Sequence, residues 1–252
     1  MKCVPILLFV TFFLLSCNEY EPFSEDDFNT YIGKTSIDSD INFTPYEQSE
    51  IEGDAPVLGL EISTEKLYPC TNYTISTSTF NNKSTLIVRI DEVTLPSNVC
   101  LTAFGAAQTS IPFSETKKKL MLINGDQIDE YYVNISDSKV SLQTISNSFS
   151  SPTYKETFRY PKNTFAFVCG TNVDNTHICS DFKSILATQA SVQEFTFNGE
   201  GKIPYPDSSG GNWRNNPSKF FSYSTIADYE KAGDLLQEFS KENLTPNDGV
   251  SI

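Results

Sequence analysis

Short runs of β-branched and aromatic residues recur between residues 57 and 146, and turn-forming residues separate them. Val, Ile, Thr, Tyr and Phe favour strands, whereas Gly, Asn, Asp and Ser favour turns. About seven strands in a segment of this length are typical of a small sandwich of two packed sheets. We therefore predict that residues 57–146 form an immunoglobulin-like β-sandwich domain.

The strongest local signal for paired strands in this segment is the stretch KKLMLINGDQIDEYYV. Asn124-Gly125 separates two apolar runs, and both residues tolerate the positive φ of a type I′ turn, which predicts a β-hairpin. Alternating apolar residues predict strands with one buried face. The alternating sets are Leu86, Val88 and Ile90, and Tyr131, Val133 and Ile135.

The periodicity of apolar residues changes after a break that is rich in Ser and Pro near residues 146–152. NTFAFVCGT, VQEFTF and KFFSYS read as strands, ICSDFKSILATQ reads as a helix, and GVSI can supply a last strand. With a second helix near the C-terminus, the predicted order is βαββαβ. This order favours a ferredoxin-like α+β domain over residues 147–252.

The second helix is predicted over residues 226–244. Thr225 can cap its N-terminus, with Asp228 three residues later as a variant of the capping box. Thr245-Pro246 stops the helix. Its apolar stripe is Ile226, Tyr229, Ala232, Leu236 and Phe239.

The N-terminus begins with Lys2 and an apolar run from Val4 to Leu15, which is too short to span a membrane and has the length of a signal peptide. Leu14-Leu15-Ser16-Cys17 resembles the lipobox of bacterial lipoproteins. The resemblance implies that residues 1–16 are removed and that Cys17 carries lipid. It also implies a protein anchored in the cell envelope, at the outer membrane.

Residues 18–56 contain eleven Asp or Glu and one Lys, which predicts an acidic, disordered tether over 17–56. Acidic residues directly after Cys17 also resemble a surface-export signal of some Gram-negative lipoproteins, and both interpretations stay open. The formal net charge of −14 repels phosphates, so we expect no nucleic-acid partner.

Six cysteines are present, and Cys3 and Cys17 are assigned to the signal peptide and to lipid. An even number of remaining cysteines in an exported chain predicts two disulfides. Three pairings of the four are open. We favour the pairing that keeps each bridge within one predicted domain, Cys70–Cys100 and Cys169–Cys179.

Catalytic and cofactor motifs are weak in this chain. His177 is its one histidine, and a zinc site from Cys169, His177 and Cys179 would require reduced cysteines. We therefore predict no metal and no cofactor, and we expect no enzymatic activity.

The feature most typical of a binding surface is a long, turn-rich loop over residues 198–219. It carries Tyr205, Asp207, Trp213 and Arg214, and exposed Trp, Tyr and Arg are common anchors of interfaces. The alternative is that Trp213 packs against its own domain.

RYPKNTFAFVCGT and KIPYPDSSGG are similar to segments of a group of uncharacterised bacterial envelope lipoproteins, a resemblance that implies no activity. We predict a lipid-anchored, non-catalytic binding or adaptor protein with a protein or glycan ligand. A structural lipoprotein of an envelope complex and a glycan-directed hydrolase are the alternatives.

Overall fold

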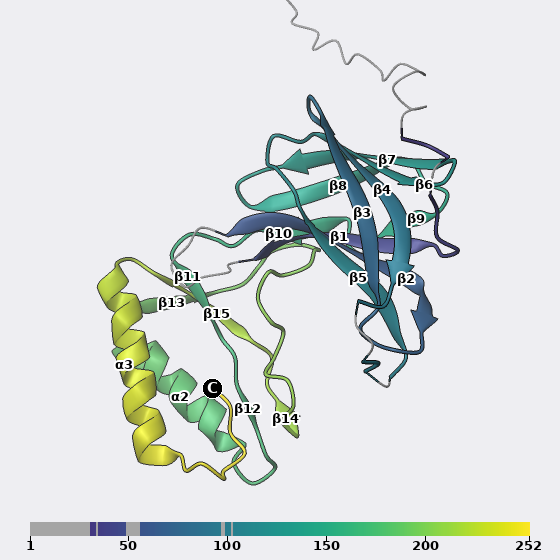
Figure 1. The fold of residues 1–252 in the computed structure, drawn as a ribbon. Coiled ribbons are helices and arrows are strands. Elements are labelled where there is room, and N and C mark those ends of the chain that lie inside the picture. Colours follow the sequence, from purple (N-terminus) through teal and green to yellow (C-terminus); the bar gives the residue numbers. More distant parts are fainter. Residues whose placement is uncertain (1–30, 34, 49–55, 97–98, 102) are drawn as a thin grey trace, which may run out of the picture.

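A computed structural model of the chain describes residues 31–33, 35–48, 56–96, 99–101 and 103–252. Figure 1 shows a large curled sheet followed by a smaller part that contains two helices. The predicted signal peptide, residues 1–16, and Cys17 lie outside the described residues. Within the described part of the chain, no helix is both long enough and apolar enough to cross a membrane.

Ten strands form the large sheet, in the order β10-β8-β7-β6-β4-β3-β5-β2-β1-β9. Most neighbours are antiparallel, whereas the β4–β6, β3–β5 and β1–β9 pairs are parallel. The strands are β1 (Ile41–Gln48), β2 (Val57–Tyr68), β3 (Thr74–Asn82), β4 (Thr85–Thr94), β5 (Gly105–Pro112), β6 (Lys119–Asn124), β7 (Gln127–Ile135), β8 (Lys139–Ser146), β9 (Ser150–Pro152) and β10 (Glu156–Phe158).

The sheet curls so that strands distant in its order face one another. The ring of Phe43 on β1 lies 4.8 Å from the ring of Tyr131 on β7, centre to centre. The Tyr131 hydroxyl donates to the carbonyl of Ser150 on β9 at 2.7 Å. The β-rich segment is therefore confirmed, but hydrogen bonds join its strands into one sheet over residues 41–158 instead of a unit bounded at 57 and 146.

The predicted alternation is visible in the core of this sheet. Leu86, Val88 and Ile90 share one cluster with Tyr131 and Val133, and all five are buried. The opposite face is also covered, because Ile87, Met121 and Ile123 pack beneath Tyr31 and Ile32. Burial of each such side chain contributes about 1.5–3 kcal/mol.

The hairpin at Asn124-Gly125 is confirmed, but its turn lies one residue later than predicted. Asn124 pairs with Gln127, so Gly125 and Asp126 form the two-residue connection. Gly125 has a φ of 63°, whereas Asn124 has no positive φ. The Asn124 side chain instead binds the backbone of Ile37, accepting from its N–H at 2.8 Å and donating to its carbonyl at 3.1 Å.

The acidic segment 17–56 is not a tether throughout. Residues 41–48 form β1, which pairs with β2 along its full length. Ile41 and Phe43 are buried, and Glu47 is only 7% exposed. The high density of carboxylates obscured a short strand that supplies one side of the core.

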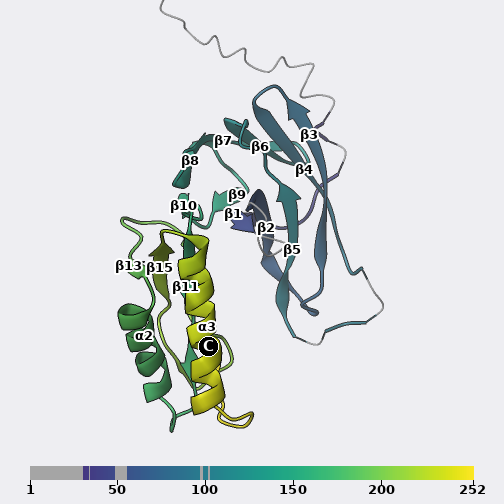
Figure 2. The ribbon, with the colours of Figure 1, turned by 90° about the vertical axis from the view of Figure 1, so that its left-hand side faces the viewer.

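The remaining part, residues 164–252, is here called the α/β unit. Its three-stranded antiparallel sheet has the order β11-β15-β13, and β12 and β14 form a separate pair. The elements are β11 (Thr164–Phe167), β12 (Gly170–Thr171), α2 (His177–Gln189), β13 (Val192–Phe195), β14 (Arg214–Asn215), β15 (Lys219–Tyr223) and α3 (Ile226–Asn243). Figure 2 shows α2 and α3 side by side over the small sheet.

Both predicted helices are present. Thr225 and Asp228 form the reciprocal capping box of α3. Ala232 and Phe239 are buried in the core that the two helices form with the small sheet, whereas Ile226, at the start of the predicted stripe, is 63% exposed. The predicted strand 163–171 is divided into β11 and β12, and Ser251 forms an antiparallel bridge with Gly170.

The two predicted disulfides are confirmed. Cys70–Cys100 has a Cα–Cα distance of 5.2 Å and joins the end of β2 to the segment before β5. Cys169–Cys179, with a Cα–Cα distance of 5.8 Å, joins the β11–β12 connection to the first turn of α2.

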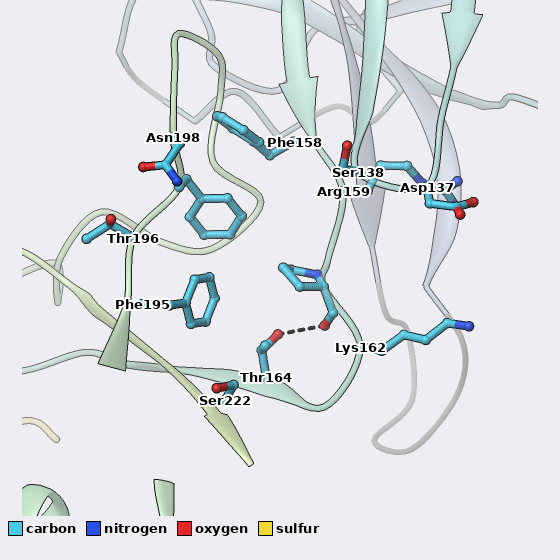
Figure 3. A pocket seen from close by; sticks show the side chains of 12 residues that line it. Asp137, Ser138, Phe158, Arg159, Lys162, Thr164, Phe195, Thr196, Asn198 and Ser222 are labelled. Carbon is cyan, nitrogen blue, oxygen red and sulfur yellow. Dashed lines mark hydrogen bonds between the residues drawn. The ribbon is translucent and has the colours of Figure 1, made fainter. Parts of the chain in front are cut away.

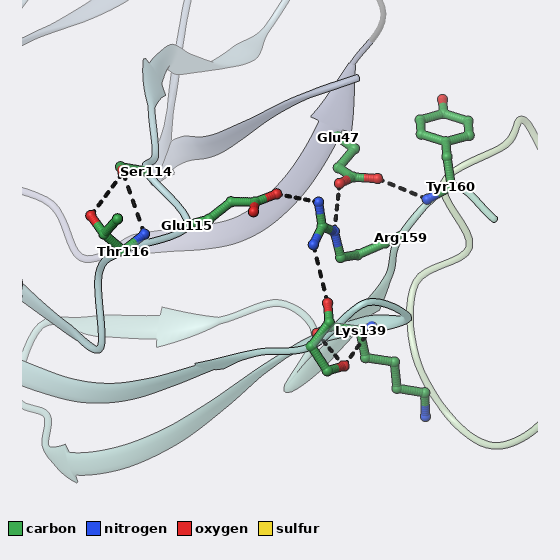
Figure 4. A network of polar contacts seen from close by, with 8 residues as sticks. Glu47, Ser114, Glu115, Thr116, Lys139, Arg159 and Tyr160 are labelled. Carbon is green, nitrogen blue, oxygen red and sulfur yellow. Dashed lines mark hydrogen bonds and ion pairs between the residues drawn. The ribbon is translucent and has the colours of Figure 1, made fainter. Parts of the chain in front are cut away.

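A polar network holds the segment that connects the large sheet to the α/β unit, as Figure 4 shows. The Arg159 Nε donates to Glu47 at 2.6 Å, and the Tyr160 backbone N–H donates to the same carboxylate at 2.7 Å. Arg159 also contacts Glu115 and donates to the Ser136 carbonyl at 3.1 Å. The segment that leaves the large sheet after β10 is thus held on β1.

Candidate functional site

The four candidate residues of the 198–219 loop do not lie together in the structure. Trp213 and Arg214 lie at an exposed end of the loop, where Arg214 begins β14. Tyr205 lies at the junction with the large sheet. Asp207 is exposed, and its backbone carbonyl accepts from the Ser218 N–H at 2.6 Å.

Trp213 is the most exposed of the large hydrophobic side chains in the described part of the chain, at 85%. The residues on both sides of it are nevertheless fixed. The Asn212 side chain donates to the Gly249 carbonyl at 3.2 Å. Beyond Trp213, Arg214 and Asn215 pair with β12. We call residues 212–215 the Trp213 tip.

The Cys169–Cys179 disulfide lies beneath this tip. The Asn216 backbone N–H donates to the Cys169 carbonyl at 3.1 Å, and its side chain contacts the Cys179 sulfur at 3.0 Å. A Cβ added to Gly170 would lie 2.8 Å from Asn212 side-chain atoms, so only glycine allows this close approach. The backbone around the exposed indole is therefore braced before any partner binds.

The zinc alternative is wrong for this structure, because both of its cysteines are oxidised to the disulfide. Disulfide sulfurs are not the thiolates that bind zinc. His177 begins α2 and is exposed. Among the described residues, no group of three or more His, Cys, Asp or Glu is arranged to hold a metal ion.

Tyr205 belongs to a group of rings at the junction. Its hydroxyl is 2.7 Å from the Thr164 hydroxyl, and its ring stacks on Phe220 at 5.5 Å and meets Tyr160 edge-on at 4.8 Å. Burial raises the pKa of Tyr205 above its usual value. We call this group the junction cluster. Its members are Phe158, Tyr160, Phe195, Phe197, Tyr205 and Phe220.

The sequence analysis did not predict the junction cluster, although one feature of the sequence indicates it. Phe220 and Phe221 are consecutive on β15, and consecutive side chains of a strand point to opposite faces. Phe221 enters the core beneath the helices, so Phe220 lies on the other face. A strand with aromatic residues on both faces predicts two packed surfaces.

A pocket of about 400 Å³ opens beside the junction cluster, as Figure 3 shows. This volume falls in the range of small-molecule sites. Its wall is formed mainly by Phe158, Pro161, Phe195 and Phe197, and its polar residues are Asp137, Ser138, Arg159, Lys162, Thr164, Thr196, Asn198 and Ser222. It lies between the β7–β8 turn and the end of β13.

No family model, no curated protein and no solved structure matches the chain. The chemistry of the Trp213 tip and of the pocket is therefore the basis for a functional proposal.

Proposed function

We propose that this chain is a lipid-anchored envelope protein of non-catalytic binding or adaptor type, which contacts a protein partner through the Trp213 tip. The lipobox-like end of the signal sequence supports the anchor. The observation that carries the binding function is the 85% exposure of Trp213 on a braced backbone.

An exposed indole has a physical cost that a partner would remove. Trp is among the largest apolar side chains, and Trp and Arg are enriched among the residues that dominate binding energy at interfaces. Trp213 and Arg214 are adjacent and both exposed. Because the tip is already ordered by β12, by the disulfide and by Gly249, binding would need little further loss of backbone entropy.

The position of the tip suits an anchored protein. Tyr31, the first described residue, packs against Phe80 near the β3–β4 turn. In Figure 1 this region lies at the opposite end of the molecule from β14. A chain anchored by Cys17 would thus present Trp213 away from its own membrane, at the outer membrane or at the cell surface.

From the arrangement of the strands, we further infer that the large sheet is immunoglobulin-like and that the α/β unit is ferredoxin-like. The contact between Phe43 and Tyr131 supports a sandwich-like, immunoglobulin-like packing of the two halves of the curled sheet. In the α/β unit, β11 and β13 flank the antiparallel β15, with a helix after β11–β12 and another after β15. This order, with Ser251 beside Gly170, supports a ferredoxin-like arrangement.

The first test uses the single tryptophan. Its fluorescence in the intact protein reports position 213 alone, and we expect a red-shifted emission that acrylamide quenches readily. A blue-shifted emission, protected until unfolding, would show that Trp213 packs against its own chain and would remove the tip as a contact surface.

The second test identifies the partner by photo-crosslinking from the Trp213 tip. A photo-crosslinking residue at Arg214 should capture one defined protein from the native envelope, and Trp213→Ala should abolish that product. A crosslinker at Phe104, which is 76% exposed elsewhere on the surface, is the matched control. Equal products from both positions would contradict the proposal, and a complex of fixed stoichiometry that survives detergent would favour the assembly alternative.

A further inference from the structure

An exposed apolar surface surrounds the Cys70–Cys100 disulfide at one end of the large sheet. Tyr68 at the end of β2 pairs with Gly105 at the start of β5, so the residues next to this pair share that end of the sheet, at the lower right of Figure 1. Four large hydrophobic side chains there are between 56% and 76% exposed. We call them the Cys100 tip: Leu67, Val99, Leu101 and Phe104.

The backbone of the Cys100 tip is held by the residues that follow β2. The Asn72 side chain donates to the Val99 carbonyl at 2.8 Å and accepts from the Leu101 N–H at 3.2 Å. The Thr71 N–H donates to the Leu101 carbonyl at 3.1 Å. Backbone groups between the exposed apolar side chains are thus already paired. This pairing lowers the cost of moving the tip into an apolar environment, where an unpaired N–H or carbonyl is unfavourable.

The sequence around the Cys100 tip is free of charge. The two segments that meet at the disulfide, residues 67–82 and 93–114, contain no Asp, Glu, Lys or Arg, although the chain as a whole has a formal net charge of −14. A protein interface combines an apolar centre with a polar rim, and Arg is enriched in it. Contact with hydrocarbon instead requires that charges stay away, because a charged side chain is costly there. The composition of this end therefore favours lipid over a protein partner.

A layer of tyrosines and then a lysine lie behind the Cys100 tip. The rings of Tyr68 and Tyr73 are 4.8 Å apart, centre to centre, and within the described part of the chain neither hydroxyl makes a hydrogen bond. Lys66 is two residues earlier on β2, with its ammonium 6.0 Å from the centre of the Tyr68 ring. Tyr is enriched where a membrane meets water, and Lys extends its charge toward the headgroups. The order of apolar tip, tyrosines and lysine matches the layers of a bilayer.

We propose that the Cys100 tip inserts into the surface of a lipid bilayer with neutral headgroups. Its apolar side chains would enter the acyl region, and the hydroxyls of Tyr68 and Tyr73 would bond to polar groups of the lipid. Neutral lipid is favoured because Lys66 is balanced by Asp38, 3.3 Å away, and the net charge repels anionic headgroups. This contact is separate from the Trp213 tip and from the acyl chains on Cys17, so it does not rest on the proposed function.

Fluorescence with phosphatidylcholine vesicles tests the proposal. The protein lacks residues 1–16, carries Cys17→Ser so that no acyl chain contributes, and has both disulfides formed. Trp213→Phe combined with Phe104→Trp places the single indole in the Cys100 tip. Its emission should shift to the blue when vesicles are added, and lipids brominated on their acyl chains should quench it.

Vesicle flotation measures the contribution of single side chains. Leu101→Ser combined with Phe104→Ser should lower the partition coefficient roughly tenfold or more, because two large apolar groups no longer leave water. Val57→Ser is the matched control, since Val57 is an exposed apolar residue at the other end of β2, and it should bind as the unaltered chain does. Trp213→Ala should also bind normally.

Four results would overturn the proposal. The first is no binding to phosphatidylcholine vesicles, and the second is unchanged binding by the double serine variant with a native circular dichroism spectrum. The third is tighter binding to phosphatidylglycerol vesicles, which would mean attraction by charge. The fourth is a blue shift of the Phe104→Trp variant that grows with protein concentration in the absence of lipid, which would mean that a second copy covers the tip. Loss of vesicle binding with an intact partner contact at Trp213, or the reverse, separates this proposal from the proposed function.

Discussion

At the scale of single residues, the buried carboxylate of Asp129 organises the end of the large sheet. It is 0% exposed and accepts five hydrogen bonds from the turn between β8 and β9. The donors are the backbone N–H groups of Ser148, Phe149 and Ser150, at 2.6, 3.0 and 2.7 Å, and the hydroxyls of Ser148 and Ser150, at 2.9 and 2.6 Å. A charge this deep is tolerated because every lone pair meets a donor.

We expect Asp129→Ala to lower the free energy of unfolding by about 3 kcal/mol, because several buried donors would lose their acceptor. Asp129→Asn keeps the shape but turns an N–H₂ group toward these donors, so it should also destabilise, by less. Urea unfolding followed by circular dichroism measures both. A loss below about 1 kcal/mol for the alanine variant would show that water replaces the carboxylate.

Single residues also show which features could not be predicted from the sequence. Asn124 carries the signal of a turn, but its side chain binds the backbone of Ile37, 87 residues away, and the turn moves to Gly125 and Asp126. Tyr205 and Trp213 lie in one loop and looked like one surface. Pairing of β14 with β12 leaves Trp213 exposed, while Tyr205 packs on Phe220. Contacts distant in sequence decide both outcomes.

At the scale of elements, local signals were the most reliable. The α3 helix was predicted from its apolar period and its cap, both of which depend on residues within a few positions of one another. The strand β1 was missed, since its identity depends on pairing with β2 and on burial of Ile41 and Phe43. The pocket was missed for the same reason, because its lining residues come from the β7–β8 turn, from the segment after β10 and from the end of β13.

The N-terminal cap of α3 leads to a prediction about how stability depends on pH. Hydrogen bonds from the Thr225 side chain and backbone lower the pKa of Asp228 from its usual value of 3.8. Because the folded-state pKa is depressed, this contribution to stability is present above pH 3.8 and is lost as pH falls through the folded value.

Thr225→Ala removes the N-cap side chain of α3 and should destabilise the chain by about 1 kcal/mol at neutral pH, the usual effect of losing such a cap. It should also make unfolding less sensitive to pH below 4. Thr225→Ser keeps the hydroxyl and is the matched control. Thermal unfolding at pH 7 and pH 3 measures both effects, and an alanine variant with unchanged stability and pH dependence would show that the capping box contributes nothing.

At the scale of the whole molecule, the network around Arg159 holds the segment that connects the two parts. Glu47 on β1 is nearly buried, and it binds both the Arg159 side chain and the Tyr160 backbone. The same segment supplies Phe158 and Tyr160 to the junction cluster. The pocket therefore depends on this connection for its shape.

Glu47→Ala should cost about 3 kcal/mol, because it leaves the Arg159 charge and the Tyr160 N–H with fewer partners in a partly buried place. Amide exchange at Tyr160 should accelerate along with the loss of stability. Asp38→Ala is the control, since it removes the exposed Lys66–Asp38 pair and should have no measurable effect. Equal behaviour of the two variants would show that the network is dispensable.

The anchor is the last whole-molecule property to test. If Cys17 carries lipid, Cys17→Ser should move the protein from the membrane fraction into the soluble fraction, because several acyl chains together hold a protein on a bilayer and their loss removes that attachment. Fractionation and the mass of the N-terminal peptide provide the measurements, with Cys3→Ser as the matched control that should stay membrane-bound. A Cys17→Ser protein that remains in the membrane with residues 1–16 still attached leaves two explanations, an uncleaved apolar segment or another membrane contact. Removing residues 1–16 from the same variant distinguishes them, and a truncated protein that still sediments with membranes would contradict the lipoprotein assignment.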